Sequence, residues 1–289
     1  MALYTLAYPQ PEAIAPNVDL VISLMGFADA GHALALVNDY IASTMELIPL
    51  AEFDSDELVD YRGRRPQTRV ERSFVADIDE ANPTLFLCRS DQGEFLLLAG
   101  YEPDFKWKAF ARAVRDLVHY YKVGRVITLY AAPFPVPHTR PQLISAHSTE
   151  PEILAAHTTI PGAITVPGAA QLYVEHFLVN TAACSVTGLN AQVPQYIAGS
   201  DYPRAAVSLL ESISSITGVG PNLQALRQDA DKVLEALDDL ADNGELGQVV
   251  LDLENRYDQM VDELSAYRLS KDDIEAEVAK FLSELDGDD

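Results

Sequence analysis

The sequence predicts an α/β protein with a helical C-terminal appendage. The main observation is an almost unbroken apolar run over residues 18–25, which is typical of a strand buried on both faces of a mainly parallel sheet. A glycine turn and a helical pattern follow it, so a βαβ unit begins here. Beyond Pro221 the apolar residues recur at helical spacing, which indicates the appendage.

The turn after this first strand is a candidate site. Gly26 ends the strand, and Asp29 is a suitable N-cap for the helix that follows. Ligands of open α/β sheets bind at the carboxyl ends of strands, so Gly26, Asp29, Gly31 and His32 are candidates for ligand or partner binding. The two glycines have the spacing of a phosphate-binding loop, but His32 stands where that loop needs its lysine.

An arginine cluster follows the second predicted strand, Met45–Phe53. Arg62, Arg64 and Arg65 lie within a few residues, and neighbouring glycine and proline residues place them on a loop. Such guanidinium groups bind phosphates and carboxylates well. Three interpretations stay open, namely a contact between subunits or with a partner, a ligand site, and a solvated loop. We treat the three arginines as interface candidates.

The middle of the chain contains a predicted hairpin and a helix. Thr84–Cys88 and Phe95–Ala99 are short strands joined by a turn sequence. A helix opens at Pro103-Asp104 and ends near Gly124, a suitable residue to follow a helix. Trp107 lies on its apolar face, which favours a core position over a ligand cage.

A second candidate site follows the next buried strand, Arg125–Ala132. The segment Pro133–Pro141 contains four prolines, so it is a stiff loop that cannot join a sheet. It begins at the same kind of strand end as Gly26. His138 and Arg140 on this loop are therefore also ligand or partner candidates.

The rest of the core alternates between strands and helices. A strand over 186–197 carries Gly188 and Pro194, which favours a bulged or edge position. Pro203 is placed near the first residue of a later helix, which ends at Gly218. The remaining elements are a strand over 142–148, an extended piece over 161–167 and a helix over 169–183.

The acidic end of the chain predicts a division into two domains, residues 1–221 and 222–289. Residues 222–289 hold 20 Asp and Glu against 6 Lys and Arg. Two apolar stripes, which include Leu240 and Val249, predict a pair of antiparallel helices. Ser270 opens a third helix with a capping-box-like pattern. The acidic outer faces are either solvated or available to a basic partner.

Composition excludes several function classes. The formal charge of −24 over 289 residues disfavours nucleic acid and anionic membranes, because both are bound by neutralising phosphates with Lys and Arg. Cys88 and Cys184 lie in apolar surroundings, as buried free thiols do. No apolar run is long enough for a membrane span, and no Lys or Arg precedes Arg62, unlike a secretory signal. We therefore expect a cytoplasmic protein.

A search for catalytic patterns finds little. The six histidines show no metal-ligand spacing, and no Gly-x-Ser-x-Gly elbow is present, so neither a metal nor a cofactor is predicted. Asp29 and His32 are one helical turn apart and are candidates for an acid and base pair. His138 is a candidate to join this pair from the neighbouring strand end. Alternatively, Asp29 is an N-cap and His138 bonds within its loop.

Three segments together resemble the PAC2 family, which contains proteasome assembly chaperones and their prokaryotic relatives. They are Gly26–Gly31, Pro137–Pro141 and the Asp201-Tyr202-Pro203-Arg204-Ala205-Ala206 helix start. The match is closest to actinobacterial members with a helical C-terminal tail. The resemblance implies a three-layer α/β/α sandwich like that of purine nucleoside phosphorylases. It also implies a homo-oligomer, with a trimer preferred, and no established reaction.

Two function classes follow from these observations. The first is a non-enzymatic assembly-chaperone-like protein that binds protein clients, as the resemblance implies. The alternative is an enzyme or small-molecule binder that uses a pocket near Gly26–His32 and His138–Arg140, since fold does not fix function. Some family members are thought to dock proteasome rings through a hydrophobic-Tyr-any-residue ending. This chain ends in Leu285-Asp286-Gly287-Asp288-Asp289, so we do not expect docking through such a tail.

Overall fold

The computed structural model describes residues 3–8, 10, 14–78, 82–159, 162–182, 184–242, 244 and 246–262. The chain forms two compact units. The first consists of Met1–Phe134 and Gln142–Val233, and the second of Pro135–Pro141 and Leu234–Asp289. The units part inside helix α7 (Gln224–Asp242) rather than at Pro221. The separate folding of residues 222–289 stays a prediction.

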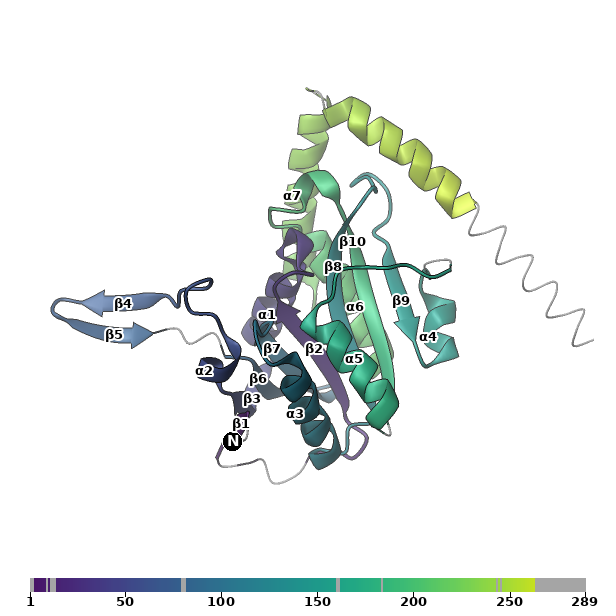
Figure 1. Cartoon of the computed structure of the whole chain (residues 1–289). Helices are drawn as coiled ribbons and strands as arrows, with labels where there is room; N and C mark the ends of the chain where they lie inside the picture. Colours follow the sequence, from purple (N-terminus) through teal and green to yellow (C-terminus); the bar gives the residue numbers. More distant parts are fainter. Residues whose placement is uncertain are drawn as a thin grey trace, which may run out of the picture. The chain divides into compact units, whose positions relative to one another are not determined.

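The first unit is built on an eight-stranded sheet with the strand order β1-β3-β6-β7-β2-β8-β10-β9 (Figure 1). Its four central strands, β7, β2, β8 and β10, are mutually parallel, whereas the outer strands pair antiparallel. The predicted hairpin is confirmed as β6 and β7. The strands are β1 (Tyr4–Leu6), β2 (Asp19–Met25), β3 (Glu46–Phe53), β6 (Thr84–Ser90), β7 (Gly93–Tyr101), β8 (Arg125–Phe134), β9 (Ile144–Ser148) and β10 (Ser185–Pro194).

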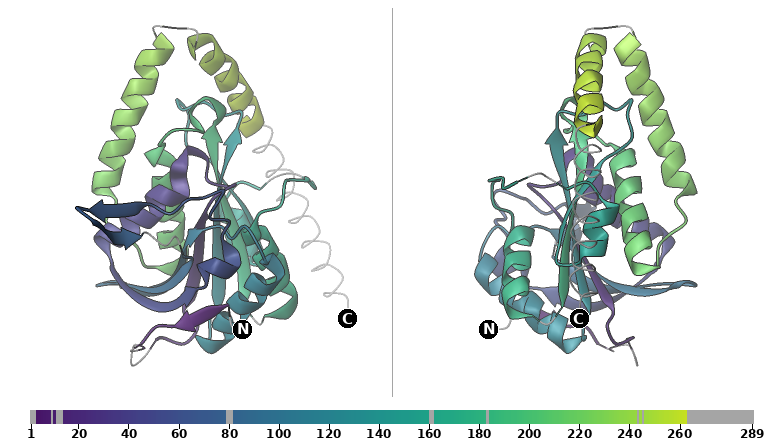
Figure 2. Two further views of the ribbon diagram at one scale, coloured as in Figure 1. Left: turned by 60° about the vertical axis from the view of Figure 1, so that its left-hand side comes forward. Right: turned by 90° about the vertical axis from the view of Figure 1, so that its right-hand side faces the viewer.

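Helices cover both faces of this sheet (Figure 2). On one face α1 (Ala33–Thr44) packs with α6 (Pro203–Thr217), and on the other α3 (Trp107–Tyr120) packs with α5 (Ala170–Thr181). The three-layer α/β/α sandwich is thus confirmed. Shorter helices are η1 (Ala30–His32), α2 (Ser55–Leu58), α4 (Pro151–Ala156) and η2 (Gln195–Ile197). Among the described residues, no helix is both long and apolar enough to cross a membrane.

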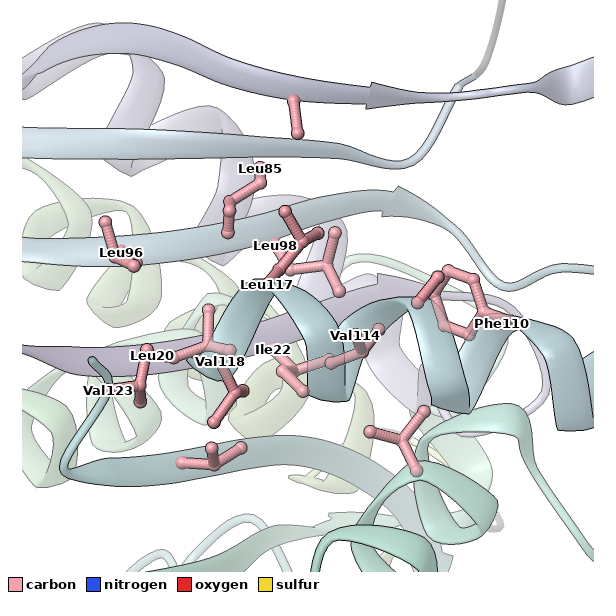
Figure 3. Packing of buried hydrophobic residues seen from close by; sticks show 14 of the residues in the cluster. Leu20, Ile22, Leu85, Leu96, Leu98, Phe110, Val114, Leu117, Val118 and Val123 are labelled. Carbon is pink, nitrogen blue, oxygen red and sulfur yellow. The ribbon is translucent and has the colours of Figure 1, made fainter. Parts of the chain in front are cut away.

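The apolar core beneath α3 explains why the central strands are hydrophobic almost throughout. Leu20 and Ile22 of β2 point toward α3, where they lie near Val114 and Leu117 (Figure 3). Val21, between them in sequence, is also fully buried, so both faces of β2 are covered. Each such side chain stabilises the fold by about 1.5–3 kcal/mol when fully buried.

The predicted boundaries of α3 need two corrections. The helix begins at Trp107 rather than at Pro103, and this end position leaves Trp107 only half-buried instead of in the core. Its indole Nε1 donates a hydrogen bond of 2.6 Å to the Pro103 carbonyl. After the helix, Lys122 and not Gly124 has positive φ (54°) and reverses the chain.

Strand β10 was predicted to be bulged or at an edge, which is wrong. It pairs with β8 on one side and β9 on the other, without a register shift. Gly188 serves close packing instead, because a Cβ there would lie 2.2 Å from the His147 ring. Pro194 ends the strand, where the missing N–H costs no internal ladder bond.

The largest feature that was not predicted is a second, smaller sheet. β4 (Thr68–Glu71) and β5 (Phe74–Ile78) form a separate two-stranded hairpin that lies away from the large sheet (Figure 1). Arg72 in its turn has positive φ (54°), although the sequence lacks the Asn-Gly or Asp-Gly signal of such turns. The hairpin exposes four large apolar side chains, Val70, Phe74, Val75 and Ile78.

In the second unit, α7 is followed by a helix over residues 246–262, as predicted. The predicted apolar stripes need adjustment. Leu240 and Val249 are exposed, whereas Leu237, Val250 and Tyr257 are buried. The predicted third helix from Ser270 lies outside the described residues.

Candidate functional site

The turn at the end of β2 is organised by a buried carboxylate that the sequence analysis missed. Glu102 directly follows β7, the parallel neighbour of β2, and is almost fully buried. Its Oε2 accepts a hydrogen bond from the Phe27 N–H (3.2 Å), and its Oε1 accepts one from the Ala170 N–H at the start of α5 (2.5 Å). Gly26 is required beside it, because a Cβ at that position would lie 2.8 Å from Oε2.

The side chain of Asp29 caps the start of α1, the role weighed against catalysis, although His32 and not Asp29 occupies the N-cap position of that helix. Its Oδ1 accepts a hydrogen bond of 2.6 Å from the Leu34 N–H in the first turn of α1. Burial raises the pKa of this carboxyl, and hydrogen bonds from the first turn of α1 oppose that rise. The adjoining backbone is held to β8, since the Ala131 N–H donates to the Ala28 carbonyl at 2.8 Å. Asp29 therefore fixes the start of α1.

His32 pairs with a residue far away in the sequence instead of with Asp29. Its Nδ1 lies 2.7 Å from Oδ1 of Asp201, just before α6, and both side chains are more than half exposed. Gly31 has φ 67°, and its N–H and carbonyl bond to Ala198 and Tyr202. The predicted acid and base pair of Asp29 and His32 is thus replaced by a link between the β2 turn and the start of α6.

His138 and Arg140, the candidates on the proline-rich loop, lie in the second unit and contact carboxylates of its acidic helices. Arg140 contacts Asp258 through Nε and Nη2, both at 2.8 Å, and Glu254 through Nη1 at 2.9 Å. These carboxylates, Asp258 first, raise the pKa of Arg140. His138 is buried, with Nε2 3.1 Å from Oδ1 of Asp238. A site that combines this loop with Gly26–His32 stays a prediction.

The three loop arginines have different surroundings. Arg64 stacks over the Tyr101 ring, with its guanidinium carbon 4.6 Å from the ring centre, and contacts Asp104 at 3.4 Å. Arg62 is exposed and has Asp60 at 3.8 Å, while Arg65 is exposed. Arg64 therefore belongs to its own subunit's structure, and the three side chains do not form one outward-facing cluster.

The arrangement at the strand ends offers binding groups more readily than a reaction centre. Within the described ranges, no group of three or more His, Cys, Asp or Glu side chains is placed to hold a metal ion. Both cysteines are free, and burial raises the pKa of the Cys88 thiol to about 12, so it stays protonated. The carboxylates of Asp29 and Glu102 already accept backbone hydrogen bonds.

A second polar cluster, also missed from the sequence, lies between the sheet and α5. The buried Glu175 accepts a hydrogen bond from the Tyr130 hydroxyl (2.8 Å) on β8 and lies 2.6 Å from Nε2 of His147 on β9. The missing side chain of Gly188 makes room for both the imidazole and the carboxylate. The hydrogen bond to Glu175 raises the pKa of His147, and burial raises that of Tyr130.

The ion pair of His147 and Glu175 should make stability fall as pH rises. The pKa of His147 is higher in the folded protein than its ordinary value of about 6.5, so protonated His147 stabilises the fold fully below that pH. The stabilisation is lost as pH rises through the folded pKa. Because the His147 side chain is 55% exposed, we expect an effect of about 1 kcal/mol or less.

Urea unfolding of the wild type and His147→Gln between about pH 5 and pH 9 measures this dependence. The difference in the free energy of unfolding between the wild type and His147→Gln should shrink toward high pH. His119→Gln is the matched control, since no ion pair with His119 occurs in the described part of the chain. A constant difference across the range would contradict the assignment.

Comparison with known proteins identifies the fold. The PAC2 family model matches residues 23–241. A protein of unknown function from Corynebacterium glutamicum is 37% identical with a TM-score of 0.85, over 91% of this chain and 99% of that one. One from Mycobacterium tuberculosis is 34% identical with a TM-score of 0.85, over 93% and 92%.

A third solved structure carries a functional description. It is a proteasome-assembly chaperone homologue from Mycobacterium tuberculosis, 23% identical with a TM-score of 0.72, over 80% of this chain and 99% of that one. At this identity the likeness shows the fold alone. No curated protein matches the chain. Since the family model spans most of the sequence and two relatives exceed 30% identity, the chain belongs to the PAC2 family.

Proposed function

We propose that this protein is a non-enzymatic, assembly-chaperone-like member of the PAC2 family that binds other protein chains. The observation that carries the proposal is the family match over residues 23–241. A fold relative described as a proteasome-assembly chaperone homologue supports it. The net charge of −24 favours basic surfaces on protein partners and disfavours nucleic acid and anionic membranes. The proposed location is the cytoplasm.

The use of the strand-end side chains supports binding over catalysis. Asp29 caps α1, and Glu102 joins the β2 turn to the start of α5. His32 is paired with Asp201. An activated nucleophile or base needs a partner that orients it toward a substrate, whereas these groups are oriented toward the protein's own backbone and side chains.

The chain is proposed to act as a homo-oligomer, with a trimer preferred. The β4–β5 hairpin supports this proposal, because its four exposed apolar side chains project from a ribbon with no further strand partner in the described structure. A two-stranded hairpin is marginally stable by itself, so it gains from covering by another chain. Arg62, which is exposed on the loop before this hairpin, is proposed to add a charged contact there.

The alternative function is an enzyme or small-molecule binder that uses the candidate residues of Gly26–His32 or those of His138–Arg140. A screen of the purified protein against nucleosides, nucleotides and acyl esters distinguishes the two. We expect no turnover above the buffer rate. Turnover that Asp29→Ala or His138→Ala abolishes would establish the enzyme instead, provided that both variants unfold at the wild-type urea concentration.

A further inference from the structure

A small pocket beside α2 is built from both charged and neutral hydrogen-bond donors. It has a volume of about 80 Å³ and is formed by residues at both ends of α2, the arginine loop and the last residue of β7. Its polar lining residues are Ser55, Tyr61, Arg64, Arg65, Gln67 and Tyr101. A pocket of this size takes one small polar group and not a nucleotide.

Arg64 is held in place before any ligand arrives. Its guanidinium lies over the Tyr101 ring, and Nη1 donates to the Glu102 carbonyl at 3.2 Å. The loop backbone is also fixed, since the N–H groups of Gly63 and Arg64 donate to the Asp60 carbonyl. A guanidinium has five N–H donors, and the described contacts leave some of them available to the pocket. This preorganisation reduces the entropic cost of binding.

Arg65 supplies a second positive charge without a competing carboxylate. Other arginines in this acidic chain are paired, such as Arg125 with Asp19 and Glu150 and Arg140 with Glu254 and Asp258. For Arg65, the described part of the chain provides no ion pair. Two guanidinium groups at one pocket, one of them unneutralised, attract an anion.

The lining of the pocket includes a buried hydroxyl, that of Ser55. Ser55 is 7% exposed, and its Oγ accepts a hydrogen bond of 2.7 Å from the Tyr61 hydroxyl. Ser55 Oγ has no second hydrogen-bond partner among the described residues, so it can bond to one further oxygen atom. A buried hydroxyl with an unused bonding position favours the approach of a further oxygen atom.

We propose that this pocket binds an oxyanion, a phosphate or carboxylate group carried by a small molecule. Arg64 and Arg65 supply the charge-assisted donors, and Ser55 supplies a neutral one. A neighbouring pocket lined by Glu52, Asp54 and Asp56 shares Ser55 and Tyr61 with the first. A ligand with a second negative group on that side is repelled, so ligands with one anionic end are favoured.

Calorimetric titration of the full chain with inorganic phosphate, and separately with acetate, tests the proposal at constant ionic strength. Saturable binding of at least one probe is expected below about 20 mM, as a weak single-group ligand requires. Arg65→Ala should weaken binding about tenfold, the loss of one charge-assisted contact of about 1.4 kcal/mol. Arg62→Ala removes a charge from the same loop outside the pocket and should change the affinity by less than about twofold.

Arg64→Lys keeps the charge but loses the planar guanidinium, and it should also weaken binding while the protein remains folded. No saturable binding of either probe, or equal weakening by Arg62→Ala and Arg65→Ala, would overturn the proposal. Light scattering with and without saturating phosphate measures whether the ligand changes the mass of the protein in solution. A change of oligomer mass would mean that the pocket takes a carboxylate of a second copy, which overturns the small-molecule assignment.

Discussion

Val70→Asp combined with Val75→Asp is expected to convert the proposed homo-oligomer into monomers. The two valines are a cross-strand pair on the β4–β5 hairpin, and they are 64% and 56% exposed in the single chain. In an assembly that covers the hairpin, two new carboxylates would lose water without gaining partners. A cost of about 3 kcal/mol for each interface corresponds to roughly a 100-fold loss of affinity.

Light scattering coupled to gel filtration at micromolar concentration measures the change in mass. Val179→Asp is the matched control, because Val179 is 52% exposed on α5, well separated in sequence from the hairpin. The control should keep the wild-type mass. Both variants should retain cooperative unfolding, since neither valine position of the hairpin nor Val179 belongs to the buried core. A monomeric wild type would contradict the proposed oligomer, and an unchanged oligomeric mass for the hairpin variant would show that another surface joins the subunits.

Periodicity predicted the central layer well because burial there is nearly complete. β2 and β8 are apolar on both faces, as parallel strands covered by helices must be, and the helical stripes of α3 and α6 face the sheet. Local turn chemistry also predicted the hairpin of β6 and β7 and the end of α6 at Gly218, which has φ 73°. These features depend on neighbours in sequence.

The features that were missed depend on contacts between distant residues or on unusual exposure. His32 pairs with Asp201, 169 residues away, and Glu102 bonds to Ala170, 68 residues away, so no local pattern marks either. The β4–β5 hairpin was missed because its apolar residues face outward and its turn residues, Arg72 and Ser73, are not typical. The interior position of β10 was missed because Gly188 was attributed to strand irregularity and not to side-chain packing.

Among the candidate-site side chains, Glu102→Ala should have the largest effect on stability. Both carboxylate oxygens are buried acceptors for backbone N–H groups, one from the β2 turn and one from the start of α5. Removing the carboxylate leaves the Phe27 and Ala170 donors unsatisfied and removes a negative charge from the helix N-terminus. We expect the free energy of unfolding to fall by about 3 kcal/mol.

Urea unfolding at pH 7 measures this loss, and two further variants separate its causes. Glu102→Gln keeps the shape and one acceptor, so it should cost only about 1 kcal/mol. Glu46→Ala, at an exposed position on β3, removes a glutamate without a buried contact and should stay within about 0.5 kcal/mol of the wild type. Amide exchange supplies a local readout, because the Ala170 N–H should exchange faster in Glu102→Ala but not in Glu46→Ala. Equal losses for the two alanine variants would show that Glu102 does not hold the β2 turn and α5 together.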